Sequence, residues 1–177
     1  MRWLGFRLRS PARFQRRQPS KVGQTELPDD HPAPDRGRGY QGAHFEVVEA
    51  AGRIVEHLEA LLDREGNPEK LLVHLAGSGW SECYLDAWIG FWHFLDDDAV
   101  EAVRGDYEGH EVDDLAARLS LTGTPVRRIT CKRSTVGTAV ELCFDHGTLV
   151  FEEVDPSDHA SRSRLAWRGA GQESAVG

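Results

Sequence analysis

The sequence predicts an α+β domain in which helices pack on one face of a mostly antiparallel sheet of about four strands. Apolar residues recur at helical spacing between residues 45 and 65. The run 71–76 is short, apolar and continuous, as in a strand covered on both faces. Residues 126–154 alternate apolar and polar side chains around turn residues, which predicts a closing three-stranded meander. The order of helix, strand, helices and strands favours this fold class.

The charges divide the chain into three parts. Residues 1–40 carry 9 basic and 4 acidic side chains, whereas residues 41–155 carry 23 acidic and 9 basic side chains, a net charge of −14. We interpret 1–40 as a disordered basic arm, 41–155 as a single acidic domain and 156–177 as a disordered tail. Two other interpretations of the arm are a start site assigned too far upstream and an anchor for nucleic acid or lipid.

The remaining elements follow from periodicity and caps. Gly66 and Pro68 end the first helix, and the strand over 71–76 is expected in the centre of the sheet. Asp97 or Asp98 is a suitable N-cap after the long apolar segment. Three more helices are predicted, over residues 81–95, 98–104 and 111–119.

The meander can be assigned a register. A two-residue turn at His146-Gly147 sets Leu142 opposite Phe151 and Phe144 opposite Leu149. A loop over Ser134 to Gly137 then sets Cys131 opposite Val140 and Ile129 opposite Leu142. All the bulky apolar residues then share one face, and the opposite face is predicted to be polar and exposed, with Arg128, Thr130, Lys132, Glu141 and Glu152.

The densest candidate site is Gly77-Ser78-Gly79, between the predicted strand and the helix that would begin at Ser81. Backbone N–H groups at such a junction favour an anion. The segment lacks a phosphate-binding lysine, and Glu82 places a negative charge where a phosphate would sit. A simple turn followed by an N-cap at Ser81 is the favoured interpretation.

A polar seam is predicted along the helix over 81–95. Glu82, Asp86, Gly90, His93 and Asp97 fall within an arc of about 80° on a helical projection. Glu82, Asp86 and His93 are therefore ligand-binding candidates, for a divalent cation or for general acid/base chemistry. The alternative is a solvated stripe in which Gly90 permits close packing.

Cys83 is a candidate nucleophile, because a helix N-terminus stabilises a thiolate and either His74 or His93 could serve as its base. The alternative is an inert packed thiol, because Glu82 beside it raises the thiol pKa. Cys83, Cys131 and Cys143 lack the spacing of a zinc site or a disulfide framework. No cofactor and no metal are predicted.

A second candidate surface is the acidic stretch after residue 95. It predicts partner-binding residues at Asp106, Glu108, Glu111, Asp113 and Asp114, which would steer a basic protein. We therefore expect a small cytoplasmic binding or regulatory protein without catalysis, such as one that neutralises a basic toxin. The alternative is a cysteine hydrolase or metal-dependent enzyme centred on Cys83, Glu82, Asp86 and His93. Nucleic acid is an expected partner only for the arm, no membrane span is predicted, and the sequence carries no signal for an oligomeric state.

Overall fold

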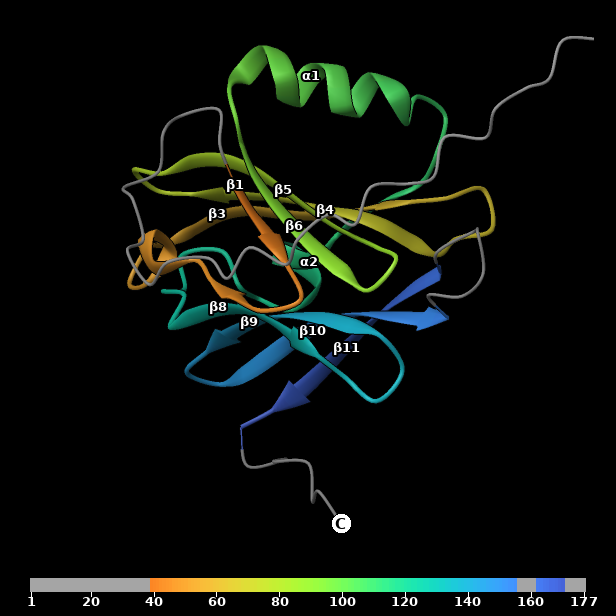
Figure 1. Ribbon diagram of the computed structural model, residues 1–177. Helices are drawn as coiled ribbons and strands as arrows, with labels where there is room; N and C mark the ends of the chain where they lie inside the picture. Colours follow the sequence, from red (N-terminus) through yellow and green to blue (C-terminus); the bar gives the residue numbers. More distant parts are fainter. Residues whose placement is uncertain (1–38, 156–161, 171–177) are drawn as a thin grey trace, which may run out of the picture. The chain divides into compact units, whose positions relative to one another are not determined.

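The computed structural model describes residues 39–155 and 162–170, which form two antiparallel β-sheets, two α-helices and one 3-10 turn (Figure 1). The predicted α+β fold with about four strands is wrong, because the described residues contain eleven strands. Most of the predicted basic arm, residues 1–38, lies outside the described part of the chain.

The first sheet, sheet one, has six strands in the order β1-β6-β5-β4-β3-β7, and all neighbours are antiparallel. The predicted central strand is confirmed within β4, between β5 and β3, where Leu71, Leu72 and Val73 are fully buried. In chain order the strands of sheet one are β1 (Gly39–Gly42), β3 (Val55–Leu62), β4 (Pro68–Leu75), β5 (Gly79–Asp86), β6 (Ile89–Leu95) and β7 (Val112–Asp114).

The second sheet, sheet two, has five strands in the order β11-β10-β9-β8-β2, and its neighbours are also antiparallel. The 3-10 turn η1 (Val48–Ala50) follows its first strand. In chain order the strands of sheet two are β2 (Phe45–Glu46), β8 (Arg128–Arg133), β9 (Thr138–Phe144), β10 (Gly147–Asp155) and β11 (Arg162–Gly169).

The inner faces of the two sheets share one core. Val73 and Trp92 of sheet one and Leu142 and Phe151 of sheet two belong to the same buried cluster, and all four are fully buried. Facing sheets bury their inward side chains in this way, with the polar residues of each strand turned outward. This shared core is the main source of burial in the described residues.

A smaller core lies on the outer face of sheet one, under α1 (Asp97–Asp106). Val100 of α1 packs there against Leu61 and Leu72. Figure 1 shows α1 on the side of sheet one that faces away from β8 to β11. The second helix, α2 (Leu115–Arg118), contacts β3. Neither helix is long and apolar enough to cross a membrane.

Side-chain caps fix the starts of both helices. The N-cap of α1 is Asp96, one residue earlier than predicted, and its carboxylate accepts the Ala99 N–H at 2.8 Å. The predicted helix over 111–119 is wrong at its start, because β7 precedes α2 there, and Asp114 caps α2. These caps use two carboxylates of the acidic stretch for structure.

The predicted helix over residues 45–65 is wrong, because this segment forms β2, η1 and β3. Two register irregularities in β3, between Val55 and His57 and between Leu61 and Leu62, explain the error. A bulge interrupts the strict alternation of a strand. Val55 and Leu58 are therefore both buried although they are three residues apart, which imitates helical spacing.

The predicted helix over residues 81–95 is also wrong, because this segment forms the β5–β6 hairpin. Both faces of the hairpin are partly covered: Trp92 points into the shared core and Leu95 packs under α1. The sequence of a strand that is covered on both faces is a continuous run of apolar residues and does not alternate between apolar and polar residues. The turn residues, Ala87 and Trp88, also lack the glycine that usually marks a tight hairpin.

The three-stranded meander is confirmed as β8, β9 and β10, and the Ser134–Gly137 loop sets Cys131 opposite Val140 as predicted. The register of the second hairpin is wrong by two residues, because Leu142 pairs with Leu149 and the turn is Asp145-His146. A shift of two keeps every side chain on its face, so Leu142, Leu149 and Phe151 are buried as expected. Gly147 is not a turn residue: a Cβ there would lie 2.4 Å from the Trp167 ring.

Trp167 belongs to β11, where we expected a disordered tail. β11 pairs with β10 over its whole length, and Leu165 and Trp167 pack against the shared core. The tail prediction is therefore wrong for residues 162–169. Residues 156–161 and 171–177 lie outside the described residues.

Candidate functional site

The β5–β6 hairpin brings Glu82 and His93 together as a cross-strand pair. Glu82 Oε1 lies 3.2 Å from His93 Nδ1, and Glu82 Oε2 lies 3.2 Å from Lys70 Nζ on the neighbouring strand β4. Only 11% of the Glu82 side chain is exposed. The carboxylate is thus enclosed by two basic groups, which offset the cost of burying its charge.

Aromatic rings lie next to this ion pair on the same face of sheet one. Tyr84 and Phe91 stack with centroids 4.5 Å apart and planes 7° apart, and Lys70 Nζ lies 5.2 Å from the centre of the Tyr84 ring. Burial, followed by the negative charges of Glu82 and Asp86, raises the pKa of Tyr84. Tyr84 therefore stays neutral at physiological pH and serves as a packing and cation–π partner.

The other two predicted members of this site lie elsewhere. Cys83 points into the shared core, on the opposite face from Glu82, and is fully buried. Asp86 is exposed four residues after Glu82, about 13 Å along the strand. In the part of the chain that the structure describes, no three His, Cys, Asp or Glu side chains are placed to hold a metal ion.

Cys83 lies in the middle of β5 and not at a helix start, so the stabilisation expected for its thiolate is absent. Burial, with smaller effects from Cys131 and Glu82, raises its pKa well above the ordinary value. Gly90 instead permits close packing, as in the alternative interpretation, because a Cβ there would lie 2.5 Å from Cys131 Sγ of sheet two. The structure therefore does not bring a nucleophile, a base and a cavity together here.

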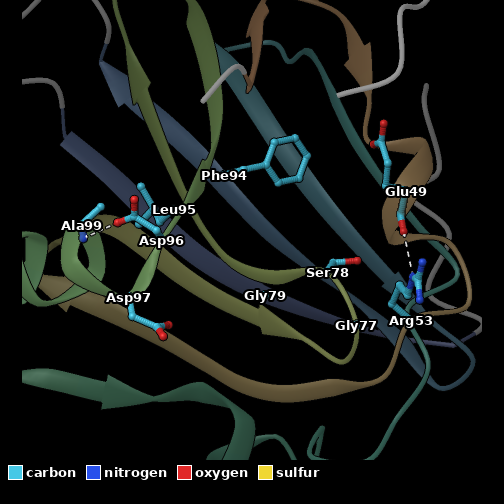
Figure 2. A pocket seen from close by; sticks show the side chains of 10 residues that line it. All are labelled: Glu49, Arg53, Gly77, Ser78, Gly79, Phe94, Leu95, Asp96, Asp97 and Ala99. Atoms are coloured by element: carbon cyan, nitrogen blue, oxygen red, sulfur yellow. Dashed lines mark hydrogen bonds between the residues drawn. The ribbon is translucent and has the colours of Figure 1, made fainter. Parts of the chain in front are cut away.

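Gly77 and Ser78 lie in the turn between β4 and β5, and Gly79 begins β5, so the segment is not a strand-to-helix junction and Ser81 lies within a strand. The turn lines a cavity of about 700 Å³ together with Arg53 and Phe94 (Figure 2). Gly77 has a φ of +75°, and a Cβ there would lie 2.9 Å from Arg53 Nη1. Glycine is needed both for this φ and for the close approach of the guanidinium.

Most polar groups around the cavity already have partners within the chain. Glu49 accepts the Tyr40 hydroxyl at 2.6 Å and 2.8 Å, and Asp96 caps α1. Arg53 Nε donates to the Glu49 carbonyl oxygen at 3.4 Å. The cavity of Figure 2 has a mixed lining with Phe94 and Leu95 beside the charged groups, and its carboxylates are largely used to hold η1 and α1 in place.

The predicted partner-binding residues lie between the end of α1 and the start of α2. Asp106, Glu108 and Glu111 are exposed. Asp113 binds Arg118 at 2.8 Å, and Asp114 accepts the Ala117 N–H at 2.9 Å. We call Asp106, Glu108, Glu111 and Asp114, together with the exposed Asp97 and Asp98 of α1, the acidic surface.

Basic side chains gather on sheet two. The sequence placed Arg128 and Lys132 on its outer face, but it did not predict the arginines of β11, where a disordered tail was expected. β8 and β11 together carry six Arg or Lys residues and no acid. On the outer face Arg164 binds Glu152 at 2.7 Å, and Lys132 binds Glu141 at 2.8 Å. The predicted polar face is therefore not fully exposed, because Glu141 and Glu152 are each only 7% exposed.

Sequence reasoning also missed a strained turn held by a buried carboxylate. Ala87 and Trp88 have φ values of 46° and 72°, and non-glycine residues in such conformations cost about 1–3 kcal/mol each. Glu153 of β10 is fully buried and accepts the Trp88 N–H at 3.2 Å and the Thr138 N–H at 2.8 Å. Burying a carboxylate also costs several kcal/mol, so both the turn conformation and the group that holds it are unfavourable by themselves and are stabilised by the surrounding structure.

Comparisons with known proteins leave the chain without a relative. No family model matches it, and neither does any curated protein or solved structure. The roles of its residues are therefore argued from geometry and chemistry alone.

Proposed function

We propose that this protein is a small non-catalytic binding or regulatory protein, and that its acidic surface engages a basic protein partner. The observation that carries the proposal is the separation of charge in the described residues. From Asp96 to Arg118 there are nine acidic and two basic residues. In β8 and β11, by contrast, every charged residue is basic. Neutralisation of a basic toxin is one role of this kind.

The acidic surface has the chemistry of an encounter surface. Glu108 and Glu111 are exposed and make no ion pair with any cation of the described residues. Val112, between Glu111 and Asp113, is 48% exposed and adds an apolar contact. Unpaired carboxylates of this kind steer a positive partner and raise its association rate, an effect that salt screens.

The enzymatic alternative gains no support from the geometry. A cysteine hydrolase needs an accessible thiolate within reach of a base. Cys83 is buried on one face of sheet one, while Glu82 and His93 lie together on the other. We therefore propose only the binding role.

The test is the association of the full chain with polylysine at low and high salt. Glu108→Gln/Glu111→Gln should slow association several-fold at low salt, because exposed charges act mainly through their long-range field. Glu46→Gln/Asp86→Asn is the matched control, because it removes the same charge from two other exposed positions. Equal slowing by both variants would show that only net charge matters and would contradict a defined acidic surface.

A further inference from the structure

The strained β5–β6 turn exposes a large aromatic ring. Trp88 is 40% exposed and is the only aromatic residue among the large apolar side chains that the described residues leave exposed. Its backbone N–H is fixed from sheet two by Glu153, a side chain with no exposure. A strained conformation that the surrounding structure enforces is a feature of functional sites.

The end of β8 supplies a cationic neighbour to this turn, and the loop that follows it carries an exposed apolar residue. The guanidinium carbon of Arg133 lies 5.7 Å from the centre of the Trp88 ring, and Arg133 forms no ion pair with the described acids. Val136 in the same loop is 37% exposed. We call Trp88, Arg133 and Val136 the Trp88 surface. Its chemistry suits a partner with an apolar residue surrounded by carboxylates.

The chain itself carries such a partner surface. Val112 is exposed in the edge strand β7, and Glu108, Glu111 and Asp114 lie beside it in sequence. The register places Val112 and the β5–β6 turn toward the same end of sheet one, because Val112 pairs with Leu61 in the row that continues through Lys70 to Tyr84. β3 and β4 separate β5 from β7, so these two strands lie about 14 Å apart across the sheet, and the Trp88 turn lies beyond the Tyr84 row along β5.

We propose that the Trp88 surface of one molecule binds the acidic surface around Val112 of a second copy of this chain. The inference rests on the proposed function, because it identifies the basic partner as the protein itself. A two-fold axis that brings each Trp88 surface onto the acidic surface of the other copy forms the contact twice and closes the dimer. A separate basic partner would then compete with dimerisation for Glu108 and Glu111.

The experiment measures the molar mass of the full chain by light scattering and its dimer dissociation constant by sedimentation at low and high salt. The wild type should dimerise, and salt should weaken the dimer. Trp88→Ala should raise the dissociation constant about 30-fold or more, as for a central aromatic contact. Val154→Ala, at another exposed apolar residue, is the matched control and should leave the dimer unchanged.

Charge exchange tests the pairing directly. Arg133→Glu and Glu108→Lys/Glu111→Lys should each be monomeric alone, and an equimolar mixture should recover a dimer, because the reversed charges attract. A wild type that stays monomeric at its solubility limit, or a mixture that stays monomeric, would overturn the proposal. A monomeric wild type that binds a single-stranded oligonucleotide through Trp88 would overturn it in favour of nucleic acid.

The polylysine assay separates this inference from the proposed function. Trp88→Ala should not weaken polylysine association, since Trp88 is not part of the acidic surface and loss of the dimer frees Glu108 and Glu111. A monomeric protein whose polylysine association still depends on Glu108 and Glu111 would overturn the dimer and leave the proposed function intact. A monomeric protein whose polylysine association does not depend on Glu108 and Glu111 would overturn both the dimer and the proposed function.

Discussion

The outer faces of the two sheets are completed in different ways. Sheet one carries α1, whose Val100 closes a second apolar core over Leu61 and Leu72. Sheet two has no such helix in the described ranges, and ion pairs such as Arg164–Glu152 and Lys132–Glu141 cover its outer face. Sheet one thus has an apolar core on each of its faces, whereas sheet two has one apolar and one ionic face.

This difference separates the charges of the domain. The side of sheet one that carries α1 is acidic. Carboxylates cap the starts of α1 and α2, and further carboxylates occupy the first turn of α1, where the helix dipole favours a negative charge. The outer face of sheet two collects arginines, because they pair with Glu141 and Glu152. Charge segregation therefore follows from how each outer face is covered.

The largest expected effect tests whether the shared core dominates both sheets. Phe151 is fully buried between the sheets, so Phe151→Ala should lower the free energy of unfolding by about 3–5 kcal/mol. Val100→Ala, which affects only the core under α1, should cost about 2 kcal/mol. Urea unfolding measures both, and equal costs would mean that the two cores are equally important.

The buried carboxylate that links the sheets should come next. Glu153→Ala leaves the N–H groups of Trp88 and Thr138 without an acceptor, each worth about 1–3 kcal/mol, although removal of a buried charge offsets part of this loss. We expect a net cost of about 2 kcal/mol in urea unfolding. Glu153→Gln keeps one acceptor oxygen and should cost less, and the opposite order would contradict the proposed role of these hydrogen bonds.

A smaller effect tests the ionic face of sheet two through pH. Burial raises the pKa of Glu152, but hydrogen bonds from Arg164 and Ser134 outweigh it and lower the pKa below its ordinary value of 4.5. A lowered pKa contributes stability above the ordinary value, and this stability is lost as pH falls through the pKa of the folded state. Thermal unfolding from pH 6 down to pH 3 should therefore show a smaller acid loss in Arg164→Ala than in the wild type.

Arg162→Ala is the control for this pH experiment. Arg162 lies on the same strand, but its partner Glu65 is 68% exposed, so the pair contributes little. Its acid loss should match that of the wild type. An identical change in both arginine variants would show that net charge, and not the Glu152 pair, determines the acid response.

The smallest effect concerns the two faces of sheet two and leaves stability untouched. Cys131 faces the shared core, where burial raises its pKa to about 12, whereas Cys143 is only half-buried. Iodoacetamide reacts with the thiolate, so native protein should be labelled first at Cys143, as mass spectrometry of tryptic peptides would show. Faster labelling of Cys83 or Cys131 would mean that the sheets separate readily.

The same contrast between the sheets explains what the sequence could predict. The meander of sheet two alternates apolar and polar residues, so its strands and inward faces were predicted correctly. The register of its second hairpin was predicted wrongly, because Gly147 was assigned to the turn. In the structure Gly147 is a strand residue whose lack of a side chain leaves room for the Trp167 ring. Sheet one was misread at β3 and at the β5–β6 hairpin, where bulges and two covered faces imitate a helix.

The candidate site was predicted only in fragments. Glu82 and His93 do lie together, but as cross-strand neighbours and not as residues on one helical seam. The Ala87-Trp88 turn has no glycine, and no local pattern reveals that Glu153 reaches it from a strand 65 residues later in the chain. Contacts of such sequence separation follow from the packing of the two sheets, which a single sequence does not display.

The close approach of Gly90 to Cys131 has a consequence for sequence divergence. A Cβ at position 90 would lie 2.5 Å from the Cys131 sulfur, closer than real Cβ contacts. Packed sheets normally stand about 10 Å apart, a distance that side chains from both layers fill. Here glycine sets the spacing between the layers at this point. Homologous chains that keep this spacing should therefore retain glycine at position 90 and a small residue at position 131, even where their surfaces have diverged.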